Sequence, residues 1–163
     1  MTTEIGYIKF TGLHGSSEET NHKQWSAVYN ISGGVKRPVA SGSGRQTIEK
    51  ATLTDMVVVK GFDAASPQLF EKCCKGEVFK EVDIEQVSNV GGNTANTVVK
   101  IKLEDVYISN YSSNSQQSPN GVLPIETLSL NFAKIEIEYT QVKVDGKIGG
   151  KSKGKWDVPA GKP

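Results

Sequence analysis

The sequence has few of the residues that build cofactor, metal or disulfide sites. Its 163 residues include only two cysteines and two histidines, and aromatic residues make up 7%. Two adjacent cysteines argue against a disulfide-stapled secreted scaffold. No apolar run approaches the roughly 18 residues of a membrane-spanning helix, and MTTEIGYIKF lacks the apolar core of a secretory signal. We therefore expect a chain made in the cytoplasm without the usual export signal and without membrane insertion.

Charge is also nearly balanced, because the net charge is only +1. This balance gives no bulk attraction to nucleic acid or membranes. The lysine-rich segment 143–163 is an exception, with six lysines against two aspartates. We interpret it as a solvated C-terminal hairpin or tail, with a weak electrostatic docking surface as the alternative. The length predicts one domain, spanning residues 1–163.

Alternation with a period of two dominates the sequence and predicts strands. In FKEVDIEQV, Val82 and Ile84 lie on one face, opposite acidic residues. In WSAVYNI the alternation predicts a core face that consists of Trp25, Ala27, Tyr29 and Ile31. Val28 lies on the opposite face. Each of these strands should have one buried and one solvated face.

The longest strand-like run, TLSLNFAKIEIEYTQVKV, changes its hydrophobic phase twice. Bulges near Ala133–Lys134 and Thr140–Gln141 would keep its apolar residues in the core. The run VVKIKLEDVYI shows a similar shift near Glu104–Asp105. Strongly bent strands of this kind favour a closed or nearly closed antiparallel β-barrel. The predicted class is therefore mainly β, with one short helix.

The helix is predicted from SPQLFEKCCKG, residues 66–76. Ser66 is a suitable N-cap, Pro67 suits the first helical position, and Gly76 suits the C-terminal stop. The pattern predicts an apolar stripe that packs on the barrel. Its members are Leu69, Phe70, Cys73 and Cys74.

Polar segments rich in glycine, serine and asparagine separate the predicted strands. Two of them, 32–46 and 112–124, read as long loops, which are uncommon in a small domain unless they are functional or mobile. The segments VGGNTAN (90–96) and VDGK (144–147) read as hairpin connections.

No pattern in the sequence predicts a catalytic, metal-binding or cofactor-binding residue. Adjacent cysteines are too close for an unstrained disulfide, and too few histidines are available to complete a zinc site. The thiols also lie at the electronegative end of the helix, so we interpret both as small buried hydrophobes. His22 is interpreted as a surface or strand-entry histidine, and GSGR (42–45) as a flexible loop rather than a phosphate-binding loop. We therefore expect a protein that is not an enzyme.

Three motifs resemble the haemolysin-coregulated protein (Hcp) family, the tube protein of bacterial type VI secretion systems. They are FDAASPQLFEKCCKGEVFKEVDIE, ETLSLNFAKIEIEYTQVKVDGK and the terminal KWDV. The resemblance implies a barrel with one helix that assembles into hexameric rings. It further implies that the rings stack into a tube, that a contractile sheath propels the tube with its spike protein, and that effector proteins travel in the lumen before secretion.

The resemblance also implies roles for individual residues. Val28 and Phe79 become candidates for outward faces buried by neighbouring subunits, and Ser32 for a residue that faces the lumen. The long loop would contact an adjacent subunit or the next ring. Its predicted contact residues are Gly33, Gly34, Val35, Lys36, Arg37, Pro38, Ser41, Gly42, Ser43, Gly44 and Arg45.

Two alternatives of other classes stay open at this point. One is a small-ligand or glycan-binding β-barrel that forms no ring, which would require an enclosed apolar pocket. The other is a thiol-dependent enzyme centred on Cys73 or Cys74, which would require a selectively reactive thiol.

Overall fold

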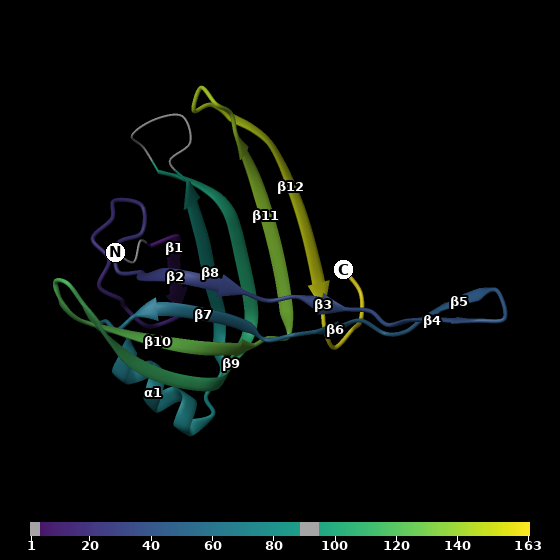
Figure 1. Ribbon diagram of the computed structural model, residues 1–163, viewed down its shortest axis with the longest axis horizontal. Coiled ribbons are helices and arrows are strands. Elements are labelled where there is room, and N and C mark those ends of the chain that lie inside the picture. The colour runs from purple at the N-terminus through teal and green to yellow at the C-terminus, as the bar shows by residue number, and fades with distance from the viewer. Residues whose placement is uncertain (1–3, 89–94) are drawn as a thin grey trace.

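Most of the chain folds into antiparallel strands, with one helix beside them (Figure 1). The structure is a computed structural model and describes residues 4–88 and 95–163. Its elements are β1 Gly6–Phe10, β2 Ser26–Ser32, β3 Val35–Lys36, β4 Val39–Gly42, β5 Arg45–Ile48, β6 Thr52–Leu53, β7 Met56–Gly61, α1 Ser66–Lys75, β8 Phe79–Ser88, β9 Asn96–Ser118, β10 Gly121–Asn131, β11 Lys134–Val142 and β12 Ile148–Asp157.

Six strands close into a barrel. They follow the order β10-β7-β2-β1-β8-β9, and a further pairing between β9 and β10 completes the circle. The closed antiparallel barrel predicted from the sequence is thus confirmed. The long strand β9 takes part twice, because its first part pairs with β8 and β11 and its last part with β10. Strands β11 and β12 therefore continue the sheet beyond the barrel, as Figure 1 shows.

The phase changes in the sequence correspond to irregularities in the strands. Asp105 has a φ of 52°, which marks the predicted shift within β9, and the pairing of β11 with β12 shifts between Thr140 and Val142 as predicted. The bulge predicted near Ala133 is instead a break between two strands. Strands β10 and β11 lie end to end along β9, separated by residues 132–133.

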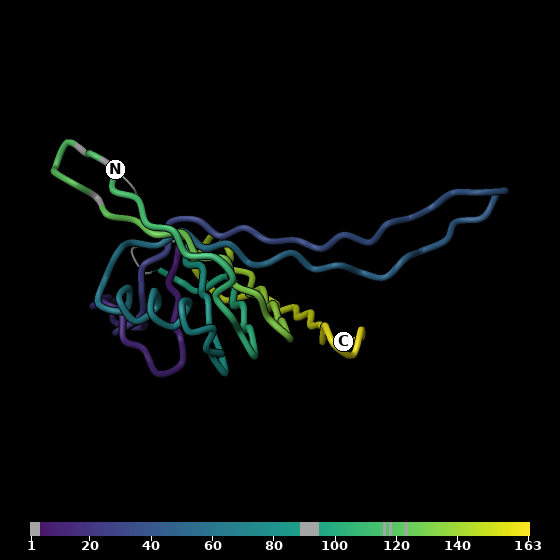
Figure 2. The backbone as a smooth tube through the Cα atoms, turned by 90° about the horizontal axis from the view of Figure 1, so that it is seen from below, coloured from purple at the N-terminus to yellow at the C-terminus, as the bar shows by residue number. Residues whose placement is uncertain are grey.

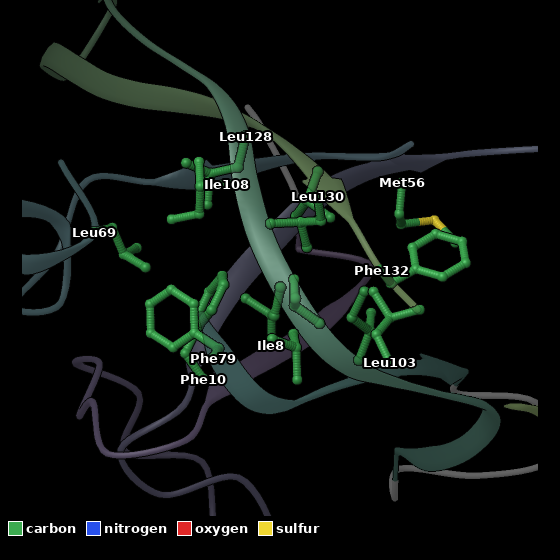
Figure 3. Packing of buried hydrophobic residues seen from close by; sticks show 14 of the residues in the cluster. Ile8, Phe10, Met56, Leu69, Phe79, Leu103, Ile108, Leu128, Leu130 and Phe132 are labelled. Atoms are coloured by element: carbon green, nitrogen blue, oxygen red, sulfur yellow. The ribbon is translucent and has the colours of Figure 1, made fainter. Parts of the chain in front are cut away.

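The barrel interior is packed with large apolar side chains (Figure 3). Val82 and Ile84 of β8 are fully buried, as their alternation predicts. Burying a side chain of this size contributes about 1.5–3 kcal/mol. Other members of the core include Ile8, Phe10, Leu103, Leu128 and Leu130.

Strand β2 buries the opposite face from the one that the sequence predicts, and Phe79 at the start of β8 is also buried where an outward position is predicted. Val28 is fully buried, whereas Tyr29 beside it is only partly buried on the outer face. Phe79 is 2% exposed in the core and Val78 is 47% exposed, so Phe79 is not an outward-facing residue. Alternation shows that two faces differ, but apolar residues on both faces leave the choice of the inner one open.

Both predicted long loops are strands for most of their length. Segment 112–124 forms the ends of β9 and β10, which turn at residues 119–120 because Ser118 pairs with Gly121. Segment 32–46 forms β3, β4 and the start of β5. The predicted turn at 144–147 is confirmed. It joins β11 to β12, so the basic segment forms a hairpin in which β12 pairs with β11. Most of the predicted connection at 90–96 lies outside the described residues. Strands β8 and β9, on either side of it, pair with each other.

Candidate assembly surfaces

A two-stranded arm, residues 33–54, extends from the barrel between β2 and β7 (Figures 1 and 2). Its outer part is the β4–β5 hairpin, in which Gly42 pairs with Arg45. Ser43 and Gly44, between them, both have positive φ values, of 51° and 77°. This is the two-residue turn that matches the natural twist of paired strands. GSGR is therefore a hairpin turn and not the predicted flexible loop.

The arm is exposed along both of its faces. Every residue from 32 to 50 is exposed, including the cross-strand apolar pair Val39 (56%) and Ile48 (61%). A two-stranded ribbon is only marginally stable by itself in water. The arm also carries four cations, and none of them forms an ion pair within the described part of the chain: Lys36, Arg37, Arg45 and Lys50. Its surface is suited to burial against a complementary partner.

An apolar groove of about 700 Å³ lies where the arm joins the barrel. It runs between the base of the arm and the apolar side of β11 and β12, where Ile135, Ile137 and Trp156 contribute to its wall. Ser32 also lines it. Because apolar residues dominate this open surface, the groove is an exposed apolar patch rather than an enclosed ligand pocket.

At the opposite ends of β2 and β7 lies a second cleft, of about 440 Å³. We call it the acidic cleft, because four carboxylates line it: Glu4, Glu18, Glu19 and Asp63. Tyr7, Tyr29 and Phe62 form its aromatic walls. Burial, and after it the nearby carboxylates, raises the pKa of both tyrosines. Glu4 contributes to both shifts, so the local field is negative.

One wall of the acidic cleft is held in place by His22, which the sequence predicts to lie on the surface or at the start of a strand. His22 lies shortly before β2 but is only 2% exposed, so the surface prediction is wrong. Its Nδ1 lies 2.5 Å from Glu19 Oε2, and its Nε2 lies 2.6 Å from Glu85 Oε2. The ring also stacks on Tyr7, with the centroids 4.5 Å apart. Through these contacts of both ring nitrogens with carboxylates, His22 ties the loop before β2 to β8. Glu85 is distant in sequence, so only folding reveals the pair.

A buried ionic network connects the barrel to the start of α1. Lys60 of β7 and Glu126 of β10 are directly opposite in the sheet, fully buried, and ion-paired. Lys60 Nζ also donates to Asp63 Oδ1 over 3.2 Å, while Glu126 accepts from Ser66 Oγ over 2.8 Å and from Tyr111 OH over 2.6 Å. Burial, and then the bond to Glu126, raises the pKa of Tyr111. The hydrogen bonds of this network satisfy the polar groups of a buried ion pair that the sequence does not predict.

Ser66 belongs to this network and does not cap the helix through its side chain, contrary to the prediction. Its hydroxyl accepts from the Asp63 N–H over 2.9 Å and donates to Glu126. Gly76 ends the helix with a φ of 66°, as predicted, and Pro67 lies in the first turn as the second helical residue rather than the first. The Ser66 hydroxyl therefore joins the start of α1 to a buried carboxylate, and Asp63 Oδ1 accepts from the Ala65 N–H over 3.0 Å.

Only part of the predicted apolar stripe of α1 faces the barrel. Leu69 is fully buried, but Phe70 is 55% exposed. Cys73 is half-buried and its Sγ lies 3.4 Å from the Ile108 carbonyl oxygen, whereas Cys74 is exposed. The prediction of two buried thiols is wrong for Cys74. Adjacent residues on a helix are about 100° apart, so a narrow contact buries only one of each pair.

Charges on the outer face of β8, β9, β11 and β12 alternate strand by strand. Acidic and basic rows follow one another, and they consist of Glu81, Asp83 and Glu85, then Lys100 and Lys102, then Glu136 and Glu138, then Lys151, Lys153 and Lys155. Exposed pairs such as Lys153–Glu136, at 3.0 Å, contribute little stability each. Opposite charges face each other at most of these positions and favour this register, although Glu81 of β8 lies opposite Glu104 of β9.

Within residues 4–88 and 95–163, no group of three or more histidine, cysteine, aspartate or glutamate side chains is arranged to hold a metal ion. Among the same residues, α1 is too short and too polar to span a membrane, and no other helix does so.

Comparison with known proteins gives consistent results over most of the chain. The model of the family described as "Type VI secretion system effector, Hcp" matches residues 7–139. The Protein hcp1 of Pseudomonas aeruginosa is 26% identical over 110 residues, which cover 67% of this chain and 66% of that protein. The chain thus spans slightly under two thirds of that curated relative.

Solved structures extend the similarity to nearly the full length. A structure of a type six secretion system protein superposes with a TM-score of 0.87 and 26% identity, covering 98% of this chain and 99% of that one. The crystal structure of Hcp1 from Salmonella typhimurium superposes with a TM-score of 0.72 and 19% identity, covering 95% and 94%. At that lower identity the second match supports the fold alone.

Proposed function

The chain belongs to the Hcp family of type VI secretion proteins, a family of structural tube proteins rather than enzymes, and on this basis we propose that it is a tube subunit. In the proposed assembly, six copies form a ring and the rings stack into a hollow tube. The observation that carries this proposal is the family match over residues 7–139, joined to an arm whose surface is uncovered in a single copy. Head-to-tail contacts close into rings only when each copy offers two different surfaces.

The arm is the proposed contact between copies. Its exposed apolar pair and unpaired cations favour burial against another subunit of the same ring or of the next one. The residues proposed for this contact are Gly33, Gly34, Val35, Lys36, Arg37, Pro38, Ser41, Gly42, Ser43, Gly44 and Arg45. Ser32, exposed at the root of the arm, is proposed to face the lumen.

The remaining partners follow from the same proposal. The tube would join a spike protein at its tip and a contractile sheath around it, and it would carry effector proteins in its lumen. We expect the protein to be made in the cytoplasm and to leave the cell through this secretion system.

Light scattering coupled to size-exclusion chromatography tests the assembly. The expected mass is about six times the 17.6 kDa of one chain, and negative-stain images should show rings. Deleting residues 35–44 should leave a folded barrel with weakened assembly, because the deletion removes most of the exposed β4–β5 hairpin and leaves the core intact. A wild-type chain that stays monomeric at all concentrations and at low salt would contradict the proposal.

A further inference from the structure

The arm and the acidic cleft lie at opposite ends of the same pair of strands. Strands β2 and β7 are neighbours, the arm connects them at one end, and Tyr29 and Gly61 near their other end line the cleft. Figure 1 shows the arm and the start of β2 on opposite sides of the molecule. An arm therefore cannot reach the cleft of its own chain.

The charges at the two ends are complementary. The arm holds four unpaired cations and a single acidic residue, Glu49. In the cleft, Glu4 and Glu18 are exposed, and neither forms an ion pair with a described residue. Both ends thus leave charges without a partner, and the two sets have opposite sign.

The chemistry of the cleft also suits the side chains that the arm offers. An arginine guanidinium binds carboxylates through paired hydrogen bonds and stacks on aromatic faces. The cleft supplies both kinds of group, with its carboxylates beside Tyr29 and Phe62. From Gly33 to Ser43 the arm runs for ten residues, which corresponds to a reach of roughly 30 Å and is enough to cross into a neighbouring copy.

We infer that the arm of one copy docks in the acidic cleft of the next copy, with its arginines among the cleft carboxylates and aromatic rings. This inference rests on the proposed tube function and names the surface that receives the arm. The contact is heterologous, because the donor and acceptor surfaces differ, and it generates a ring or a continuing stack.

Charge reversal tests the contact in the full-length chain. Reversing the arm with Arg37→Glu and Arg45→Glu, or the cleft with Glu4→Lys and Glu18→Lys, should weaken association in sedimentation experiments by at least about tenfold. Placing both reversals in one chain should restore association, because each reversed arm then meets a reversed cleft. Raising the salt concentration should weaken the wild-type assembly but not the fold.

Matched controls separate this contact from general effects of charge. Lys143→Glu with Lys147→Glu changes the net charge as the arm reversal does, and Glu71→Lys with Glu77→Lys changes it as the cleft reversal does. Neither pair lies in the arm or the cleft, so both controls should assemble normally.

A covalent trap provides a second measurement if a reversed chain folds poorly. In a Cys73→Ser, Cys74→Ser background, chains with Arg45→Cys are mixed with chains carrying Glu18→Cys and oxidised. A disulfide-linked mixed dimer is expected. The inference would be overturned if the chain with the reversed cleft assembled normally, or if the chain with both reversals did not regain association. Either result would leave the proposed tube function intact. A monomeric wild type would instead contradict the tube function itself.

Discussion

Replacing Lys60 by methionine should strongly destabilise the fold, because the change leaves the Glu126 carboxylate buried without its cation. Removing one partner of a buried ion pair costs about 3–5 kcal/mol. Glu126 would keep its bonds from Ser66 and Tyr111, of 2.8 and 2.6 Å, so we expect the lower end of that range. Lys153→Met is the matched control, because Lys153 pairs with acidic residues on an exposed face and its replacement should change stability little.

A double-mutant cycle separates the ion pair from the rest of the network. Glu126→Leu alone leaves Lys60 with Asp63 as its remaining carboxylate partner and removes the acceptor of Ser66 and Tyr111, so it should cost at least as much as Lys60→Met. The double variant removes the acceptor of these two hydroxyl groups and the cation beside Asp63, and each group left unsatisfied costs about 1–3 kcal/mol. Urea unfolding followed by tryptophan fluorescence, at one fixed protein concentration, gives the four free energies. If the double variant lost as much as the two single variants together, the paired charges would not be coupled and the reasoning would be refuted.

Three further predictions concern individual positions. Phe79→Ala should cost about 3–5 kcal/mol and Phe70→Ala less than about 1 kcal/mol in an isolated subunit, measured by urea unfolding, because only Phe79 lies in the core. Cys74→Ser should be neutral within about 0.5 kcal/mol; mass spectrometry after alkylation should show Cys74 reacting before the half-buried Cys73. Burial, then repulsion from neighbouring acids, raises the pKa of Asp83 from 3.8 to about 6, so its contribution to stability is lost as the pH rises through that window. Asp83→Asn should therefore stabilise the protein at about pH 7.5, by less than about 1 kcal/mol after solvent screening, and leave it unchanged near pH 3.5.

The sequence predicts the barrel well because its local signals are physical constraints on strands. A phase change at Glu104–Asp105 can be accommodated only by an irregular residue, and Asp105 supplies it with a positive φ. Gly76 likewise ends α1 where the sequence places the stop. These features depend on neighbouring residues alone, so no tertiary information is needed.

Contacts between distant segments are the features that the sequence does not predict. Lys60 and Glu126 are 66 residues apart, and His22 and Glu85 are 63 apart. Each looks like an ordinary surface charge until the sheet brings the pair together. The sequence also does not show which side of β2 faces inward, because Val28 and Tyr29 are both apolar enough for a core. An apolar outer face indicates a surface that a neighbouring molecule can bury.

The cations of the arm affect which contacts between copies are favoured. An exposed β-hairpin offers two unpaired strand edges, and uncharged edges would favour pairing of arm with arm. Four cations on each arm make that symmetric pairing repulsive. The same charges favour a surface of opposite sign, which the acidic cleft provides at the other end of β2 and β7. Charge of one sign at each end thus disfavours two-fold pairing of arm with arm and is consistent with the proposed head-to-tail contact, which a ring requires.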